Sequence, residues 1–296
     1  MITFEVLINT NNPDIIDNNY VLSLINDFES GSWRYEKFQN YIWNNISETA
    51  LSKVERDSLI NKPISVLVES AKKLRITDND KIGEGSELCE ILLYGIMKEH
   101  YSALPVVPKI FYKQNPNDNA KGADSVHIVI EDNDFSLWFG EAKFYKNIDG
   151  AIISAVDSVD SFLRNDEQIK KENSIITSIS DIDKMGLSDE LIEKIKATLS
   201  GENSLDDIKT KINIPILLLH ECAITKKTKD LTDEYKNKII SFHRDEANKY
   251  FKKQVEKMSD IFKYADIKFH LILFPIPDKK VIADAFVANA NHYRGQ

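Results

Sequence analysis

The chain has 296 residues, of which 42% are hydrophobic and 29% are charged, and its formal net charge is −9. This composition is ordinary for a globular protein, and the length allows one large domain or two modest ones. The acidic balance counts against a free-standing nucleic-acid-binding protein, because such proteins usually carry a basic surface that neutralises phosphates. No apolar run approaches the roughly 20 residues that span a bilayer, and no signal peptide is indicated. We therefore expect a soluble, cytoplasmic protein without a membrane partner.

Residues 1–78 are predicted to form a mostly helical N-terminal region. It begins with a short strand over residues 2–9, after which apolar residues recur at helical spacing. The polar, turn-rich segment 76–86 is a candidate boundary. The helices predicted before that boundary cover residues 20–28, 33–46 and 63–75.

Residues 79–296 are predicted to form an α/β (α+β) core. A helix, three successive strands, a second helix and further buried strands imply a mixed central sheet flanked by helices. A polar stretch at about 170–210 is predicted to be an insertion or a lid. The expected helices cover 86–100, 149–164, 232–264 and 278–292, and the expected strands cover 107–112, a hairpin within 122–145, 214–224 and 266–276.

The hairpin carries the side chains that suggest chemistry. On its second strand Glu141 and Lys143 share one face, because successive side chains alternate along a strand. The alternate positions of that strand are apolar and suit a core. Asp124 begins the first strand, so we expect it beside Glu141. Two carboxylates and a lysine at a sheet edge are typical of a metal site that hydrolyses phosphodiesters.

Two resemblances follow from these residues. Asp124, followed 17 positions later by Glu141-Ala142-Lys143, resembles the signature of the PD-(D/E)xK nuclease superfamily, with Ala123 in place of the usual proline. The order of helices and strands also matches the core of that superfamily. More closely, residues 85–101, 108–130 and 137–152 resemble HamA, the family of nuclease subunits of Hachiman antiphage defence systems. That resemblance implies a DNA-degrading effector that is held and regulated by a superfamily 2 helicase, HamB.

Hydrolysis of a phosphodiester needs an activated water and stabilisation of the developing negative charge. Mg²⁺ supplies both and prefers oxygen ligands. We therefore expect Asp124 and Glu141 to bind Mg²⁺, for which Mn²⁺ could substitute, with the backbone carbonyl of Ala142 as a third ligand. Lys143 would orient the water or help to deprotonate it. An additional acid is expected from the helix at 86–100, where Glu87 is the first choice and Glu90 the runner-up.

The sequence thus predicts a Mg²⁺-dependent deoxyribonuclease. Its helicase partner would bind the DNA, for which an acidic chain has little affinity. The alternatives are a nuclease that acts on RNA or on specific DNA structures, and an inert nuclease-fold module that only binds a partner. The Glu-Lys pair could also be an ordinary solvated strand face. His127 lies on the opposite strand face from Asp124 and is expected either in the core or behind the metal ligands, without binding the metal itself. Lys113 could contact the scissile phosphate or could be a surface lysine.

Overall fold

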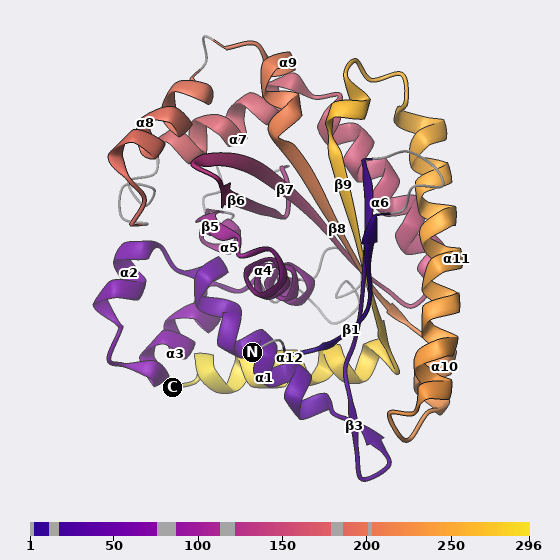
Figure 1. Cartoon of the computed structure of the whole chain (residues 1–296). Helices are drawn as coiled ribbons and strands as arrows, with labels where there is room; N and C mark the ends of the chain where they lie inside the picture. The colour runs from indigo at the N-terminus through magenta and orange to yellow at the C-terminus, as the bar shows by residue number, and fades with distance from the viewer. Residues whose placement is uncertain (1–2, 12–17, 76–86, 113–121, 179–185, 201–202) are drawn as a thin grey trace.

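The computed structural model of the chain describes residues 3–11, 18–75, 87–112, 122–178, 186–200 and 203–296. Its centre is a seven-stranded mixed sheet in the order β1-β2-β9-β8-β7-β6-β5 (Figure 1). Strands β2, β9, β8 and β7 run parallel, and antiparallel pairs complete both edges. The strands are β1 Glu5–Asn11, β2 Asn19–Ile25, β3 Phe28–Glu29, β4 Ser32–Trp33, β5 Leu104–Val107, β6 Ser125–Glu131, β7 Asp134–Tyr145, β8 Ile212–Glu221 and β9 Lys268–Ile276.

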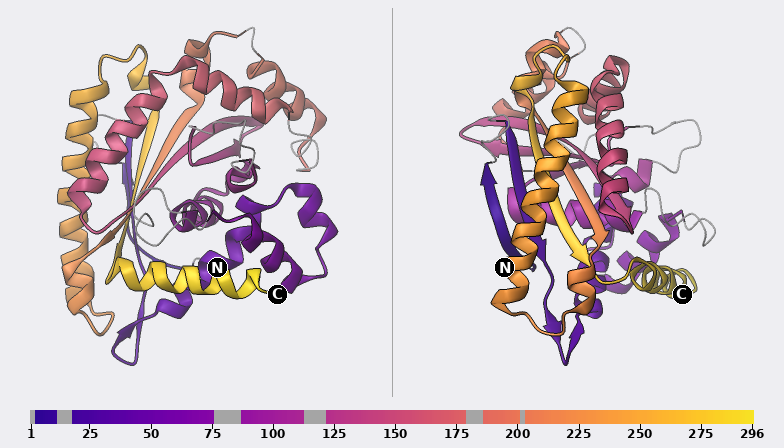
Figure 2. Two further views of the ribbon diagram at one scale, coloured as in Figure 1. Left: turned by 180° about the vertical axis from the view of Figure 1, so that it is seen from behind. Right: turned by 90° about the vertical axis from the view of Figure 1, so that its right-hand side faces the viewer.

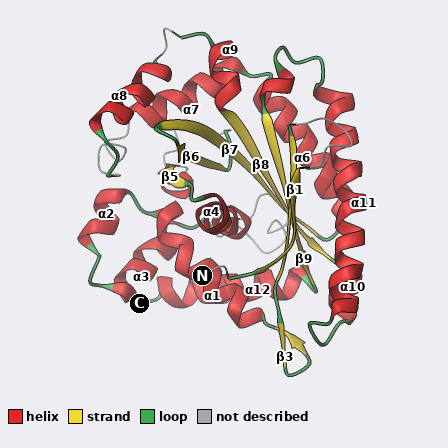
Figure 3. Cartoon of the chain, viewed as in Figure 1, coloured by secondary structure: helices red, strands yellow, loops and turns green. Residues whose placement is uncertain are grey.

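Helices cover both faces of this sheet (Figures 2 and 3). One layer contains α1, α4 and α12, and the other contains α6 and the long α11, while α7 continues from the end of α6. The helices are α1 Tyr35–Ala50, α2 Lys53–Ser58, α3 Pro63–Lys73, α4 Glu87–Tyr101, α5 Lys109–Tyr112, α6 Ile148–Leu163, α7 Asp166–Ser178, α8 Asp189–Thr198, α9 Leu205–Ile208, α10 Ala223–Lys227, α11 Asp233–Met258 and α12 Lys279–Arg294.

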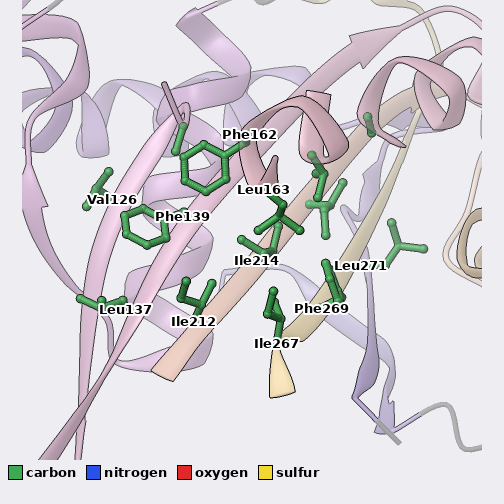
Figure 4. Close-up of a cluster of buried hydrophobic side chains, with 14 of the residues drawn as sticks. Val126, Leu137, Phe139, Phe162, Leu163, Ile212, Ile214, Ile267, Phe269 and Leu271 are labelled. Atoms are coloured by element: carbon green, nitrogen blue, oxygen red, sulfur yellow. The ribbon is translucent and has the colours of Figure 1, made fainter. Parts of the chain in front are cut away.

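The central strands are apolar at successive positions because both of their faces are covered. On β8, Ile216 and Leu218 point into the cluster under α6 and α11, whereas Leu217 and Leu219 point into the cluster under α1, α4 and α12. Figure 4 shows part of the first cluster, where Phe139 of β7 packs near Phe162 of α6. A continuous apolar run is the pattern expected of a parallel strand buried on both sides. The predicted buried strands at 214–224 and 266–276 are therefore confirmed as β8 and β9.

The prediction of a helix over residues 20–28 is wrong. Residues 19–25 form β2, which pairs parallel with β9 and is almost entirely buried. A short apolar run fits a buried strand and a buried helix equally well, so its periodicity could not separate the two. The predicted strand at 107–112 is also largely wrong, because β5 ends at Val107 and α5 begins at Lys109, directly after a proline.

The mixed α/β class with a helix-flanked central sheet is confirmed and is consistent with a nuclease-like fold. The N-terminal region adds α1, α2 and α3, and it also contributes β1 and β2 to the main sheet. The candidate boundary at 76–86 lies outside the described residues. The division of the chain into residues 1–78 and 79–296 stays a prediction.

Candidate active site

A tight hairpin brings the two strands of the site together. Asp132 and Asn133 both have positive φ, 48° and 60°, which suits a two-residue turn between twisted antiparallel strands. The resulting register places Ser125 of β6 opposite Gly140 of β7. Asp124, one residue before β6, is therefore brought level with Glu141. The predicted hairpin at 122–145 is confirmed.

Two hydrogen bonds hold Asp124 in this position. Its backbone N–H donates to the carbonyl oxygen of Gly140 at 2.7 Å, and its Oδ2 accepts from the backbone N–H of Ala142 at 3.0 Å. A Cβ on Gly140 would lie 2.1 Å from Ser125 Oγ and 2.8 Å from Leu93 Cδ2, so this close approach requires glycine. The carboxylate of Asp124 is thus fixed by the backbone of the neighbouring strand.

Glu141 and Lys143 form an ion pair on the same face of β7. Lys143 Nζ lies 2.6 Å from Glu141 Oε1, and each side chain is only 13% exposed. Burial and the negative charge of Asp124 raise the pKa of Glu141 to about 7, against the opposing effects of Lys143 and a hydrogen bond from Ser158 of α6. Burial lowers the pKa of Lys143, but the carboxylates of Glu141 and Asp124 outweigh it and raise that pKa overall. The structure therefore brings together the three side chains that were predicted from the hairpin.

The two candidate acids on α4 have different surroundings. Glu87 Oε2 accepts a hydrogen bond from the backbone N–H of Arg75 at 2.8 Å, which connects the start of α4 to the end of the α3 region. Glu90 is only 3% exposed. Burial and then the charges of Asp124 and Glu90 raise the pKa of Cys89, so both carboxylates act on the same thiol. Neither Glu87 nor Glu90 lines the cleft described below, and the choice between them stays a prediction.

A cleft of about 920 Å³ opens beside Asp124 and Glu141. Its other walls are α6 and α7. The residues of these walls, among them Ser158, Gln168 and Lys171, were missed by the sequence reasoning. The cleft is lined by Gly122, Asp124, Glu141, Tyr145, Gly150, Ile153, Ser154, Asp157, Ser158, Ser161, Phe162, Asn165, Glu167, Gln168 and Lys171.

The missed wall residues left different signals in the sequence. On α6 the cleft-lining Ser154, Ser158 and Ser161 recur every three or four positions, opposite the predicted apolar face, and Asn165 continues this spacing just beyond the helix, so a polar stripe was readable. The positions of Gln168 and Lys171 depend on how α7 packs after the end of α6. No local pattern encodes that packing.

The paired carboxylates suit a hard divalent cation. After burial, the charge of Asp124 is the second cause of the raised pKa of Glu141, and a cation bound by both carboxylates would relieve that repulsion. Within the described ranges no group of three or more His, Cys, Asp or Glu side chains is close enough to hold a metal. A third ligand would therefore come from the backbone or from water. The role of the Ala142 carbonyl stays a prediction.

The other residues considered from the sequence lie away from this pair. His127 is 1% exposed, its ring centroid lies 4.5 Å from that of Tyr94, and burial lowers its pKa to about 3. Its predicted place in the core is confirmed. Both cysteines, Cys89 and Cys222, are buried free thiols. Lys113 lies outside the described residues.

Comparison with known proteins identifies the family. A family model described as HamA matches residues 1–290 of the chain. The chain belongs to the HamA family. Membership makes it a component of a Hachiman antiphage defence system, which implies that it has partners. Neither the curated proteins nor the solved structures gave a match. In the described part of this HamA chain, no helix is long and apolar enough to cross a membrane.

Proposed function

We propose that this HamA chain is a metal-dependent phosphodiesterase that degrades DNA as the effector of its defence system. The observation that carries the proposal is the placement of Asp124, Glu141 and Lys143 on one hairpin, beside an open cleft of about 920 Å³. Charged side chains are rarely buried without a function, and a buried carboxyl group whose pKa lies near 7 is typical of an active site. The alternative of an ordinary solvated strand face does not fit side chains that are 13% exposed.

Each residue has a distinct role in this proposal. Asp124 and Glu141 would hold Mg²⁺ or Mn²⁺, which when bound supplies a Lewis acid and makes a bound water more acidic. Lys143 has a raised pKa and so stays charged at neutral pH. It therefore suits the stabilisation of negative charge on the phosphate better than the removal of a proton from water. Ser158 donates to Glu141 and orients its carboxylate.

We further propose that a helicase of the HamB type delivers DNA to the cleft. The chain carries a net charge of −9, and the cleft itself contains the acids Asp157 and Glu167 besides the carboxylate pair. Such a surface repels a polyanion, so little affinity for DNA is expected from this subunit alone. A partner that binds DNA would supply the missing affinity.

The test is cleavage by the HamA chain assembled with a helicase of the HamB type. Defined DNA and RNA substrates are incubated with Mg²⁺, with Mn²⁺ and with EDTA. We expect DNA cleavage that requires the metal and is absent from a folded Glu141→Ala/Lys143→Ala double variant. Full cleavage by the folded double variant would refute the assignment, and RNA cleavage alone would establish the rival nuclease. An assembled complex that neither binds metal nor cleaves would favour the inert module.

Metal binding by the chain is expected to release protons below neutral pH. Because the pKa of Glu141 is about 7, this carboxyl group is largely protonated at pH 6.5 and must lose its proton to bind a cation. Titration calorimetry with Mn²⁺ in two buffers of different ionisation enthalpy measures the release. We expect it to be substantial at pH 6.5 and nearly absent at pH 8.5.

The matched control for this titration is Glu167→Gln, which alters an exposed acid of the same cleft and should leave proton release unchanged. Glu141→Gln should abolish the release and weaken binding. Identical heats in both buffers at pH 6.5 would show that Glu141 does not ionise on binding.

A further inference from the structure

The cleft is strongly acidic for a site that is proposed to receive a phosphodiester. Among the described residues that line it, four are acids and Lys171 is the single cation. Lys143 pairs with Glu141 and Lys257 pairs with Asp157, but a carboxylate without such a partner repels a phosphate at close range. Lys171 lines the cleft from α7, whereas Asp124 and Glu141 line it from the hairpin.

A buried ion pair fixes the helix that carries Lys171. The next residue on α7, Glu172, lies with its Oε1 2.5 Å from Lys109 Nζ of α5, and the two side chains are 5% and 3% exposed. Consecutive helical residues point about 100° apart, so Glu172 can face α5 while Lys171 faces the cleft. On the same helix Ile169 and Ile176 are buried in the core. The orientation of α7 is thus set by this ion pair and by the two buried isoleucines.

Gly122 lets this ion pair form at the rim of the cleft. A Cβ at this position would lie 1.9 Å from Glu172 Oε1 and 3.4 Å from Lys109 Nζ. Any side chain here would displace the Glu172 carboxylate. Gly122 also lies two residues before Asp124, so the ion pair lies beside the segment that carries a predicted metal ligand.

Stability alone does not explain this pair. Removing two charges from water is costly, and apolar side chains of similar volume often stabilise a fold as well or better. What an ion pair between two helices supplies is a defined orientation. In this fold that orientation decides which residues of α7 face Asp124 and Glu141.

We propose that Lys171 binds a phosphate of the nucleic-acid strand in the cleft, and that the Lys109–Glu172 pair is the positioning device that holds it there. This inference rests on the proposed nuclease function. Lys171 neutralises the phosphate from the wall opposite the hairpin, while Lys143 acts from the hairpin side. Phosphate contacts of this kind fix the register of a strand without reading its sequence.

The first test compares Lys171→Ala with Lys170→Ala in the assembled complex. Lys170 is an exposed lysine on the same helix that does not line the cleft, so both variants change the net charge equally. We expect Lys171→Ala to raise KM roughly tenfold, with a smaller change in kcat, and to reduce the slope of log(kcat/KM) against log salt by about 0.7–0.9. Lys170→Ala should match the wild type, and Lys171→Arg should restore most of the affinity. Equal KM values and salt slopes for the two alanine variants would overturn the role of Lys171.

The second test concerns the positioning pair. Lys109→Met/Glu172→Met removes both charges and keeps side-chain volume. We expect its melting temperature to stay near the wild-type value while KM rises as in Lys171→Ala and amide exchange in α7 becomes faster. A charge-swapped Lys109→Glu/Glu172→Lys variant should bring KM part of the way back to the wild-type value. This variant keeps the test decisive if the methionine variant folds poorly. Wild-type KM and wild-type exchange in a folded methionine variant would overturn the positioning role.

These outcomes separate the inference from the function on which it rests. If the wild-type complex cleaves no nucleic acid, the proposed function itself fails. If the wild type cleaves and Lys171→Ala behaves like Lys170→Ala, only the phosphate-binding role of Lys171 fails. In either case the rate of amide hydrogen exchange in α7 shows whether the Lys109–Glu172 pair holds that helix in place.

Discussion

Replacing Glu141 by glutamine, or Lys143 by methionine, is expected to lower DNA cleavage by the assembled complex at least about a hundredfold without unfolding the chain. Glutamine keeps the shape of Glu141 but cannot supply an ionised oxygen to a divalent cation. Methionine keeps the volume of Lys143 but removes the charge that lies 2.6 Å from Glu141. Initial rates at saturating Mg²⁺, together with thermal denaturation, measure both effects.

Glu167→Gln and Lys146→Met are the matched controls for these substitutions. Glu167 is an exposed acid in the same cleft, and Lys146 is exposed just beyond the end of β7. Both controls should retain near-wild-type rates, because Glu167 lies on the α7 wall of the cleft and Lys146 lies outside the cleft lining. If Glu141→Gln and Glu167→Gln slowed cleavage equally, the loss would reflect the overall charge of the cleft. The hairpin would then not be the catalytic centre.

The hairpin site was predictable because its geometry is local. Alternation along β7 fixes Glu141 and Lys143 on one face, and the turn at Asp132 and Asn133 fixes which residue of β6 lies opposite. The position of Asp124 beside Glu141 follows from that register. These relations need only short-range rules, so the sequence alone was enough to bring the three side chains together.

Features that depend on packing between distant segments were not predictable in this way. The apolar run at 19–25 is a strand because β9 lies beside it, and residue 269 of that strand is some 250 positions away in the chain. Lys171 and Gln168 line the cleft because the Lys109–Glu172 contact orients α7. The place of Glu87 likewise depends on its hydrogen bond to Arg75. None of these contacts has a periodic pattern in the sequence.

The folded chain is expected to lose stability steeply as the pH falls from 6.5 to 5. Burial lowers the pKa of His127 and His270 to about 3, that of His220 to about 4, and that of His243 well below its ordinary value. A histidine whose folded pKa is depressed stabilises the fold above its unfolded pKa of about 6.5, and this contribution is lost as the pH falls towards the folded value. Four such groups together contribute a slope of up to about 5 kcal/mol per pH unit.

Glu141 acts in the opposite direction over part of this range. Its pKa is raised to about 7, so its stabilising contribution is complete below its unfolded pKa and is lost as the pH rises through 7. In the metal-free chain Glu141 therefore cancels the contribution of about one of the four histidines to the slope. A slope of about 4 kcal/mol per pH unit remains. At that slope the fall from pH 6.5 to 5 removes about 6 kcal/mol, a large part of a total stability of roughly 5–15 kcal/mol. Urea denaturation at pH 7.5, 6.5 and 5.5 measures this slope.

His127→Phe is the sharpest variant for this experiment. The His127 ring packs against Tyr94, and within the described structure neither of its nitrogens has a hydrogen-bond partner, so phenylalanine should fill the site without leaving a polar group unpaired. We expect stability at pH 7.5 to be retained or increased and the acid slope to fall by about 1.4 kcal/mol per pH unit. His292→Phe, at an exposed position on α12, should leave the slope unchanged. An unchanged slope in His127→Phe would show that acid instability arises from groups other than the buried histidines.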